Sequence, residues 1–161
     1  MKIVKVGMAD LNVARSPDRI KTIGLGSCVG ITLYDKVSKI GGMAHIMLPS
    51  ASLVKGGDVN HAKYADTAIP KLVSNLISMG VDRRRLIAKI AGGAQMFPLS
   101  GSSDIMRIGP RNVEACKEVL KMEKIPLYAE DTGGNWGRTV EMDCVTGKVE
   151  IRSFNREVKE I

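Results

Sequence analysis

Residues 22–49 read TIGLGSCVGITLYDKVSKIGGMAHIMLP, and this stretch decides the fold of the protein. No charged residue occurs between Thr22 and Tyr34, and the run Val29–Tyr34 is rich in the β-branched and aromatic residues that favour strands. A second uncharged run begins at Ile40 and contains His45. Because a short polar turn separates the two runs, the stretch predicts an antiparallel β-hairpin.

The expected pairing of this hairpin brings its cysteine and its histidine together. If the turn is centred between Lys36 and Val37, Cys28 pairs with His45. Directly opposed residues of an antiparallel pair point to the same face, with Cβ atoms roughly 4.5–5.5 Å apart. A bulge at the two glycines of the second strand would slip the register by one residue and turn one side chain to the other face.

Cys28 and His45 each have a structural interpretation as well as a catalytic one. Gly24, Gly26 and Ser27 precede the cysteine, a pattern typical of a bulge or a tight strand entry beside an inert thiol. Apolar neighbours are likewise typical of a core histidine. As a pair, however, the two residues form a nucleophile and a base, because an imidazolium lowers the cysteine pKa from about 8.5 and later serves as general acid.

A Cys–His pair needs a third group to hold the imidazole tautomer. The stretch offers no carboxylate on the right side, but the Thr22 hydroxyl could accept the second ring N–H of His45. Thr22 lies about 20 Å from Cys28 along an extended strand, so the chain must fold back at GLG, residues 24–26. Gly24 and Gly26 would then leave backbone N–H groups where an oxyanion could form.

The whole chain, residues 1–161, is expected to form a single domain of the α+β class with roughly seven strands and two helices. Apolar residues recur at helical spacing from His61 to Met79, where Pro70 is expected to kink the helix or mark its start. A second helix is expected after Pro110. Further strands are expected at MKIVKVG (1–7), RLIAKIAGG (85–93), GRTVEMDCV (137–145) and VEIRSF (149–154), the last two as a hairpin, with site-rimming loops near 50–60, 92–108 and 130–138.

The net charge of +7 favours an acidic protein partner over nucleic acid. The basic residues are scattered apart from DRRR at 82–85, and only six residues are aromatic, so the stacking platforms and basic repeats of nucleic-acid-binding proteins are missing.

The longest uncharged run, residues 40–54, is too short and too polar for membrane insertion. Three cysteines without a CxxC pair are typical of a cytoplasmic protein; Cys116 and Cys144 are expected in the core and His61 at the surface.

Five segments carry a resemblance to a known family: LGSCVGITLYD, KIGGMAHIMLP, KYAD, IGPRN and GGNWGRTVEMDCVTGKVEI. Together they resemble the chemoreceptor glutamine deamidase family of bacterial and archaeal chemotaxis, CheD, from about Gly7 to Ile151. The resemblance implies hydrolysis of selected glutamine side chains on the cytoplasmic helices of chemoreceptors to glutamate, with release of ammonia. It implies a triad of Cys28, His45 and Thr22.

The same resemblance implies an architecture and a second partner. The fold is expected to be a layered mixed, largely antiparallel β-sheet with helices, similar to the catalytic domain of cytotoxic-necrotizing-factor toxins that deamidate small GTPases. The second partner is the CheC-type phosphatase of CheY-phosphate, which the family binds and stimulates.

A pocket is expected around the triad. Backbone N–H groups near Gly26 and Ser27 are expected to support the oxyanion, and Asn135 and Arg138 are expected at the rim to bind amide or backbone oxygen, although turn chemistry alone would explain the latter two equally well. The reaction needs no metal and no organic cofactor. Two other functions remain open: a regulatory partner of the phosphatase that does not use its thiol, and a receptor methylesterase with the same triad.

Overall fold

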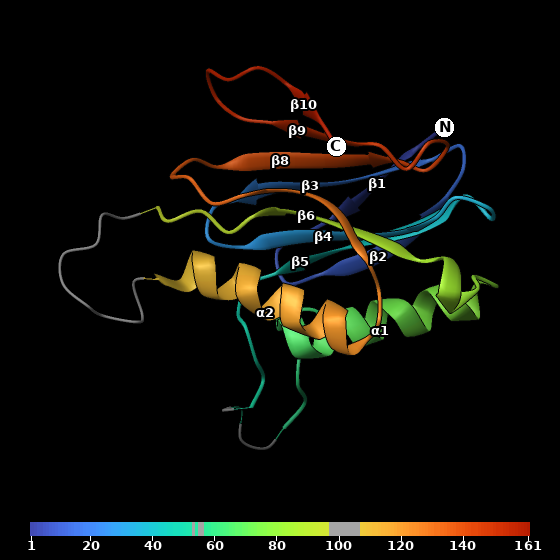
Figure 1. Ribbon diagram of the computed structural model, residues 1–161, viewed down its shortest axis with the longest axis horizontal. Helices are drawn as coiled ribbons and strands as arrows, with labels where there is room; N and C mark the ends of the chain where they lie inside the picture. Colours follow the sequence, from blue (N-terminus) through green and yellow to red (C-terminus); the bar gives the residue numbers. More distant parts are fainter. Residues whose placement is uncertain (53, 55–56, 97–106) are drawn as a thin grey trace.

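The computed structural model describes residues 1–52, 54, 57–96 and 107–161. In this part of the chain, two five-stranded β-sheets and two α-helices form three layers (Figure 1). Sheet A is the upper layer and sheet B the middle one, and the helices α1 (Ala65–Ser78) and α2 (Ile108–Met122) cover the other face of sheet B. The mixed α+β class predicted from the sequence is confirmed.

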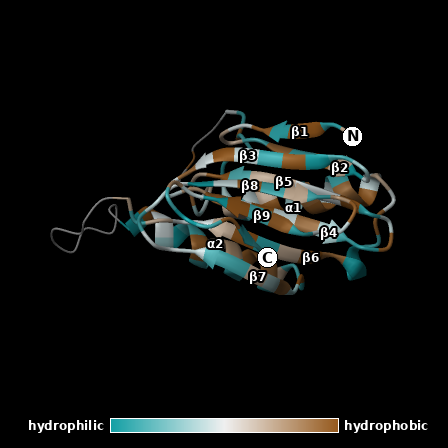
Figure 2. Ribbon diagram, turned by 90° about the horizontal axis from the view of Figure 1, so that it is seen from above, coloured by the Kyte–Doolittle hydropathy of each residue, from teal (hydrophilic) through white to brown (hydrophobic). Residues whose placement is uncertain are grey.

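Sheet A contains both ends of the chain. Its strand order is β1 (Ile3–Val6), β3 (Arg19–Leu25), β8 (Arg138–Asp143), β9 (Val149–Arg152) and β10 (Lys159–Glu160). β1 runs parallel to β3 and the other pairs are antiparallel. Hydrophilic and hydrophobic residues alternate along β3 as teal and brown segments in Figure 2, as expected for a strand with one covered face. The strand at the N-terminus and the late hairpin are confirmed.

Sheet B holds the hairpin that was predicted from residues 22–49. Its strand order is β2 (Leu11–Arg15), β5 (Ile40–Ile46), β4 (Val29–Asp35), β6 (Ile87–Gly92) and β7 (Leu127–Thr132). Every residue of β4 and β5 is buried, because sheet A covers one face of these strands and the helices cover the other. This double burial explains why the two strands are almost free of charge. β2 and β7 were not predicted.

Sheet B separates two hydrophobic cores. Alternate residues of β4, such as Val29 and Ile31, pack with the helices, whereas Tyr34 packs between the two sheets. Cys116 belongs to the helix-side core and Cys144 to the core between the sheets, and His61 is exposed, which confirms the three sequence-based expectations.

The predicted helices are confirmed, with one change at the first. α1 begins at Ala65 and contains Pro70, so this proline does not mark the start of the helix. Neither α1 nor α2 is long and apolar enough to cross a membrane, and the other described segments include no helix that is. The expected loops near 50–60 and 92–108 fall partly on residues 53, 55–56 and 97–106, which lie outside the described residues.

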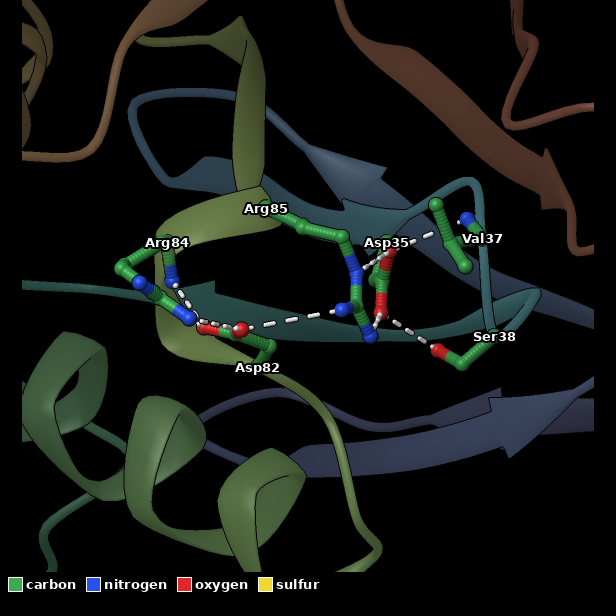
Figure 3. Close-up of polar contacts among 6 residues, drawn as sticks. All are labelled: Asp35, Val37, Ser38, Asp82, Arg84 and Arg85. Atoms are coloured by element: carbon green, nitrogen blue, oxygen red, sulfur yellow. Dashed lines mark hydrogen bonds and ion pairs between the residues drawn. The ribbon is translucent and has the colours of Figure 1, made fainter.

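The predicted register of the β4–β5 hairpin is wrong by two residues. Asp35 pairs with Ile40, so the turn consists of residues 36–39 and His45 lies opposite Gly30 rather than Cys28. Asp35 stays in the strand because its carboxylate anchors the turn: it accepts hydrogen bonds from Val37 N–H at 3.0 Å and from the Ser38 hydroxyl at 2.7 Å (Figure 3). The turn is therefore shifted by one residue along the chain, and its last residue, Lys39, adopts a φ of +56°.

Candidate active site

Three elements bring the expected triad residues to one end of the stacked sheets. Thr22 lies in β3 of sheet A, Cys28 directly precedes β4 of sheet B, and His45 is the penultimate residue of β5. The chain crosses from one sheet to the other between β3 and β4. Before the crossing, the pairing of β3 with β8 slips after Thr22, and Gly24 adopts a φ of +76° that residues with a Cβ rarely take. The fold-back expected from the sequence occurs in this segment.

Thr22 fixes the tautomer of His45. Thr22 Oγ1 lies 2.8 Å from His45 Nδ1, and the Thr22 hydroxyl donates its proton to the backbone oxygen of Val6, also at 2.8 Å. Because a hydroxyl has only one proton, Oγ1 must accept the bond from the ring, and His45 therefore carries its proton on Nδ1. The other ring nitrogen, Nε2, is unprotonated, buried, and without a partner among the described residues.

Cys28 lies on the same face of sheet B as His45, although the two are not directly opposed. His45 pairs with Gly30, and Cys28 precedes Gly30 by two residues, a spacing that preserves the face of an extended chain. Diagonal neighbours of this kind are roughly 7–8 Å apart, within the combined reach of a thiol and an imidazole. A Cβ at position 30 would lie 3.0 Å from Leu25 Cδ1 and 3.6 Å from Thr22 Cγ2. The missing side chain of Gly30 leaves room between the strands.

Burial sets the charge states of the pair. Cys28 is 9% exposed and His45 is 1% exposed. Burial raises the pKa of the Cys28 thiol above its ordinary value of 9.0 and lowers the pKa of the His45 imidazole below 6.5. Both shifts favour the neutral forms, so at neutral pH the thiol and the imidazole are both uncharged. The sequence-based expectation of a preformed thiolate–imidazolium pair is not supported.

The loop Gly26–Cys28 is held through its carbonyl oxygens. These three oxygens accept hydrogen bonds, in chain order, from Ala94 N–H at 2.9 Å, from Asn112 Nδ2 at 3.0 Å and from Gly93 N–H at 2.8 Å. The N–H groups of the same three residues donate to none of the described residues. A fixed loop with free N–H groups beside a thiol has the donors that an oxyanion requires.

Asn112 is a site residue that the sequence analysis missed. It lies in α2, is fully buried, and donates through Nδ2 to Ser27 O and, at 2.9 Å, to Met47 O, one residue beyond β5. Asn112 therefore ties the loop that carries Cys28 to the end of the strand that carries His45. Asn112 lies in the segment IGPRN, but nothing in that segment indicates its two partners, which are 85 and 65 residues away in the sequence.

The other residues predicted for the site are Gly26, Ser27, Asn135 and Arg138. Gly26 and Ser27 form the loop before Cys28, as expected. Arg138 is buried and forms an ion pair with Asp131 at 3.1 Å, while Asn135 is exposed in the preceding turn and has no described contact with the triad. Among the residues described, no group of three or more His, Cys, Asp or Glu side chains has the arrangement of a metal site.

Comparison with known proteins identifies the family. The family model for CheD, described as CheD chemotactic sensory transduction, matches residues 47–153. The chemoreceptor glutamine deamidase CheD of Halalkalibacterium halodurans is 55% identical over 159 residues, covering 99% of this chain and 98% of that protein. The chain belongs to the CheD family. The CheD protein of Bacillus subtilis, which has the same descriptive name, is 47% identical over 159 residues, covering 99% of this chain and 96% of its own length.

A solved structure resembles this CheD family member in fold. A Neisseria meningitidis protein of the DUF152 family matches with a TM-score of 0.50 and 8% sequence identity, over 84% of this chain and 65% of that chain. At this identity the likeness concerns the fold alone. The expected similarity to toxin deamidases stays a prediction. Thr22, Cys28 and His45 precede the segment matched by the CheD family model, so their grouping rests on the geometry described above.

Proposed function

We propose that this chain is a cysteine-dependent deamidase that hydrolyses glutamine side chains of chemoreceptors to glutamate, with Cys28, His45 and Thr22 as its triad. One observation carries the proposal: the Thr22 hydroxyl, committed to Val6 O, leaves the His45 ring with a free basic nitrogen in the core that contains the thiol. The substrate is inferred from the CheD relatives, which are named chemoreceptor glutamine deamidases.

The first step is attack on the side-chain amide. Cys28 Sγ bonds to the amide carbon of the substrate glutamine while His45 Nε2 takes the thiol proton, so the thiolate forms only as it is used. The carbonyl oxygen becomes an oxyanion, which the free N–H groups of residues 26–28 stabilise by roughly 3–4 kcal/mol for each well-placed donor. Thr22 stabilises the imidazolium by accepting the Nδ1 proton throughout.

The second half returns the enzyme to its starting state. The carbon–nitrogen bond breaks as His45 Nε2 donates its proton to the departing nitrogen, which gives ammonia and a thioester on Cys28. A water molecule then loses a proton to His45 and attacks the thioester carbon. Breaking the carbon–sulfur bond releases glutamate, and Sγ recovers its proton. Water and glutamine are consumed, and glutamate and ammonia are formed.

The proposal is tested with a chemoreceptor cytoplasmic fragment and intact-mass analysis, which detects the exchange of an amide NH2 for OH. We expect Cys28→Ala to abolish conversion. Thr22→Val, which keeps the shape and removes the hydroxyl, is expected to lower kcat on the order of 10³-fold by releasing the tautomer, whereas Thr22→Ser should keep most of the activity. If Cys28→Ala converted glutamine at the rate of the wild type, the proposed cysteine-dependent activity would be refuted. The remaining function would then be that of a regulatory partner.

Other expectations accompany the proposed activity. The same triad would hydrolyse a receptor methyl ester, and release of methanol from a methylated fragment, without conversion of glutamine, would favour the methylesterase instead. Binding of a CheC-type phosphatase, a cytoplasmic location and folding of residues 1–161 as a single domain remain part of the proposal. Co-purification with the phosphatase should persist in Cys28→Ala, because the mutation leaves the surface unchanged.

A further inference from the structure

A shallow hollow of about 490 Å³ opens at the end of sheet A where β3 finishes and β8 begins. It is lined by residues from three segments, among them Gly24, Trp136, Arg138, Arg152 and Phe154. The chain of β3 continues from this hollow into the loop that carries Cys28, and Leu25 of β3 pairs with Arg138 of β8. Figure 1 shows the start of β8 and the loop after β9 at the same end of the molecule as the N-terminus of α2, which holds the Cys28 loop.

Apolar side chains at and beside this hollow face solvent. Phe154 is 89% exposed, Trp136 is partly exposed, and Ile23, which directly precedes the lining residue Gly24 in β3, is 66% exposed. A group of exposed apolar side chains beside a hollow is typical of a protein contact surface, whereas single scattered apolar residues need no partner. The volume lies within the range of binding pockets, and the open shape suits a protein segment better than a small molecule.

Cations surround the aromatic ring of the hollow. The guanidinium carbon of Arg156 lies 3.5 Å from the centre of the Trp136 ring, and that of Arg138 lies 5.1 Å from it. The ring is seated against the backbone, because a Cβ at Gly134 would collide with it. Both cations are therefore placed on a fixed aromatic platform, which limits the entropy lost when they bind a ligand.

These cations are only partly neutralised within the protein. Asp131 serves both Arg138, at 3.1 Å, and Lys159, at 3.2 Å, and Arg156 has no carboxylate partner among the described residues. The terminal nitrogens of Arg138, Nη1 and Nη2, are buried without a hydrogen-bond partner in the described part of the chain, and the Arg138 side chain is 0% exposed. The buried Arg138 therefore contributes positive charge close to the Trp136 ring, and the exposed Arg156 is the cation that a carboxylate of a partner can reach.

The basic run at residues 82–85 behaves differently. Arg83 forms an ion pair with Glu123 at 2.7 Å. Arg84 and Arg85 form ion pairs with Asp82 and Asp35, at 2.9 and 2.8 Å (Figure 3). Asp35 belongs to the turn between β4 and β5, at the opposite end of these strands from Cys28. The positive charges of this run are neutralised by carboxylates of the same chain. The hollow is therefore the better candidate for binding an acidic partner.

We propose that the hollow around Trp136 and Phe154 docks an acidic segment of the chemoreceptor that flanks the target glutamine. The inference rests on the proposed function. Apolar side chains of the segment contact Phe154 and Trp136, and its carboxylates pair with the exposed Arg156, while the buried charge of Arg138 adds a longer-range attraction. Because Gly24 of the hollow lies four residues before Cys28 in the chain, a segment docked there would bring a neighbouring glutamine towards the thiol.

The test measures binding of a chemoreceptor cytoplasmic fragment to the Cys28→Ala protein, which needs no chemistry. Trp136→Ala and Phe154→Ala are each expected to raise Kd about tenfold, as loss of an aromatic anchor does. Arg156→Glu is expected to raise Kd at least as much, with an effect that shrinks as salt is added. Glu157→Gln, which removes an acid beside Arg156, is expected to tighten binding. Tyr128→Ala, an exposed aromatic on β7, and Arg15→Glu, an exposed arginine on β2, serve as matched controls with unchanged Kd.

A second fragment identifies the contact. When acidic residues within two helical turns of the modified glutamine are replaced by alanine, Kd should rise and Arg156→Glu should have no further effect, since residues in contact are not additive. If Arg156→Glu raised Kd equally for the original fragment and for the fragment without acidic residues, the proposal would be overturned. A Kd unchanged by Trp136→Ala, Phe154→Ala and Arg156→Glu would do the same, as would a dimer in sedimentation that Phe154→Ala dissolves while receptor binding persists.

Two readouts separate this inference from the proposed function. The alkylation rate of Cys28 in each hollow variant reports whether the catalytic loop is intact, and the exposed Arg156 can be changed even if a variant at Trp136 fails to fold. If Cys28→Ala still converts glutamine, the proposed function fails, while the binding measurements stand unchanged. If conversion requires Cys28 but the Kd of the receptor fragment is unchanged by the substitutions in the hollow, only the docking inference fails.

Discussion

The neutrality of the candidate site follows from the choice of Thr22 as the group that orients His45. An aspartate in this place would add a negative charge, which stabilises imidazolium and raises the pKa of the histidine. The threonine hydroxyl accepts the Nδ1 proton at 2.8 Å without a charge of its own. Nothing therefore offsets burial, and the pKa of His45 falls while that of Cys28 rises. Two neutral groups of this kind fit the proposed attack by a thiol that loses its proton to the imidazole as it reacts.

The pH dependence of activity tests this neutral pair. Because burial holds the pKa of His45 below 6.5, protonation of the base should halve kcat/KM only at a pH below 6.5. Because burial holds the pKa of Cys28 above 9.0, alkylation of Cys28 by iodoacetamide should climb with pH to values above 9.0. The urea-unfolded chain, in which the cysteine has its ordinary pKa, is the control.

A preformed ion pair predicts the opposite profile. The alkylation rate would then reach a plateau at acidic pH, and kcat/KM would fall on the alkaline side as the imidazolium lost its proton. Either result would show that the charge states follow the usual Cys–His pattern and that burial does not decide them.

Among the elements, helix α2 connects the loop of Cys28 and the end of the strand of His45, the proposed nucleophile and base. Asn112→Asp keeps the shape of the side chain but cannot donate to Ser27 O and Met47 O. Two buried carbonyl groups would then lose their partner, so we expect unfolding to require about 2–4 kcal/mol less free energy. The loop would also move relative to His45, and kcat should fall about 100-fold with little change in KM.

Kinetics and urea unfolding check this expectation together. Asn12→Asp is the matched control, because Asn12 is exposed on β2 and uses only its Oδ1, which aspartate retains. A loss of stability with an unchanged kcat would reduce Asn112 to a structural residue.

The turn of the central hairpin depends on one buried carboxylate. Asp35 accepts hydrogen bonds from Arg85 Nε at 3.0 Å and Nη2 at 2.8 Å as well as from the turn, and these contacts, with Arg85 foremost, lower its pKa from 3.8 to about 2 (Figure 3). A lowered folded-state pKa contributes stability above pH 3.8 that is lost as the pH falls towards 2. Asp35→Asn should therefore cost about 3 kcal/mol at pH 7 and weaken the acid dependence of unfolding below pH 3.8.

Thermal and urea unfolding at several pH values measure both effects. Asp82→Asn, which affects an exposed ion pair of the same network, should lose less stability. If Asp35→Asn and Asp82→Asn lowered the free energy of unfolding equally, burial of Asp35 would contribute nothing to the stability of the turn.

The same hairpin shows how far the sequence predicts this site. The uncharged runs were sufficient to identify β4 and β5, because only doubly covered strands exclude charge so completely. The register was predicted two residues out, since the anchoring of the turn by Asp35 depends on Arg85, fifty residues away. A two-residue error preserves the face, so Cys28 and His45 still share one side of the sheet. The Asn112 bridge, which joins three segments, has no local signal.

At the scale of the whole molecule, the candidate site exists only where the two sheets meet. Thr22 comes from sheet A, whereas Cys28 and His45 belong to sheet B, and the carbonyl group that accepts the Thr22 proton is in β1, paired in parallel with β3. Parallel pairing and stacking between sheets involve contacts that are distant in sequence, which local patterns do not encode. This explains why β2, β7 and the stacking itself were not predicted.

The three cysteines report whether these layers unfold together, as a single domain would. Cys116 lies in the helix-side core and Cys144 in the core between the sheets, both fully buried, and burial raises their pKa values to about 12 and about 11. Both should resist alkylation in the native protein, where only Cys28 reacts. Because sheet B forms one wall of each core, Cys116 and Cys144 should become reactive at the same urea midpoint and with the same slope.

Pulse alkylation followed by peptide mass analysis resolves the two sites, and Cys28→Ala removes the signal of the native state. If Cys144 reacted at lower urea concentrations than Cys116, sheet A would open as a separate unit, and a local opening would then be enough to part Thr22 from His45. Activity should in that case vanish before Cys116 is exposed. With cooperative layers, loss of activity and the exposure of both buried thiols should coincide, since no step separates the orienting hydroxyl from its base without unfolding the cores.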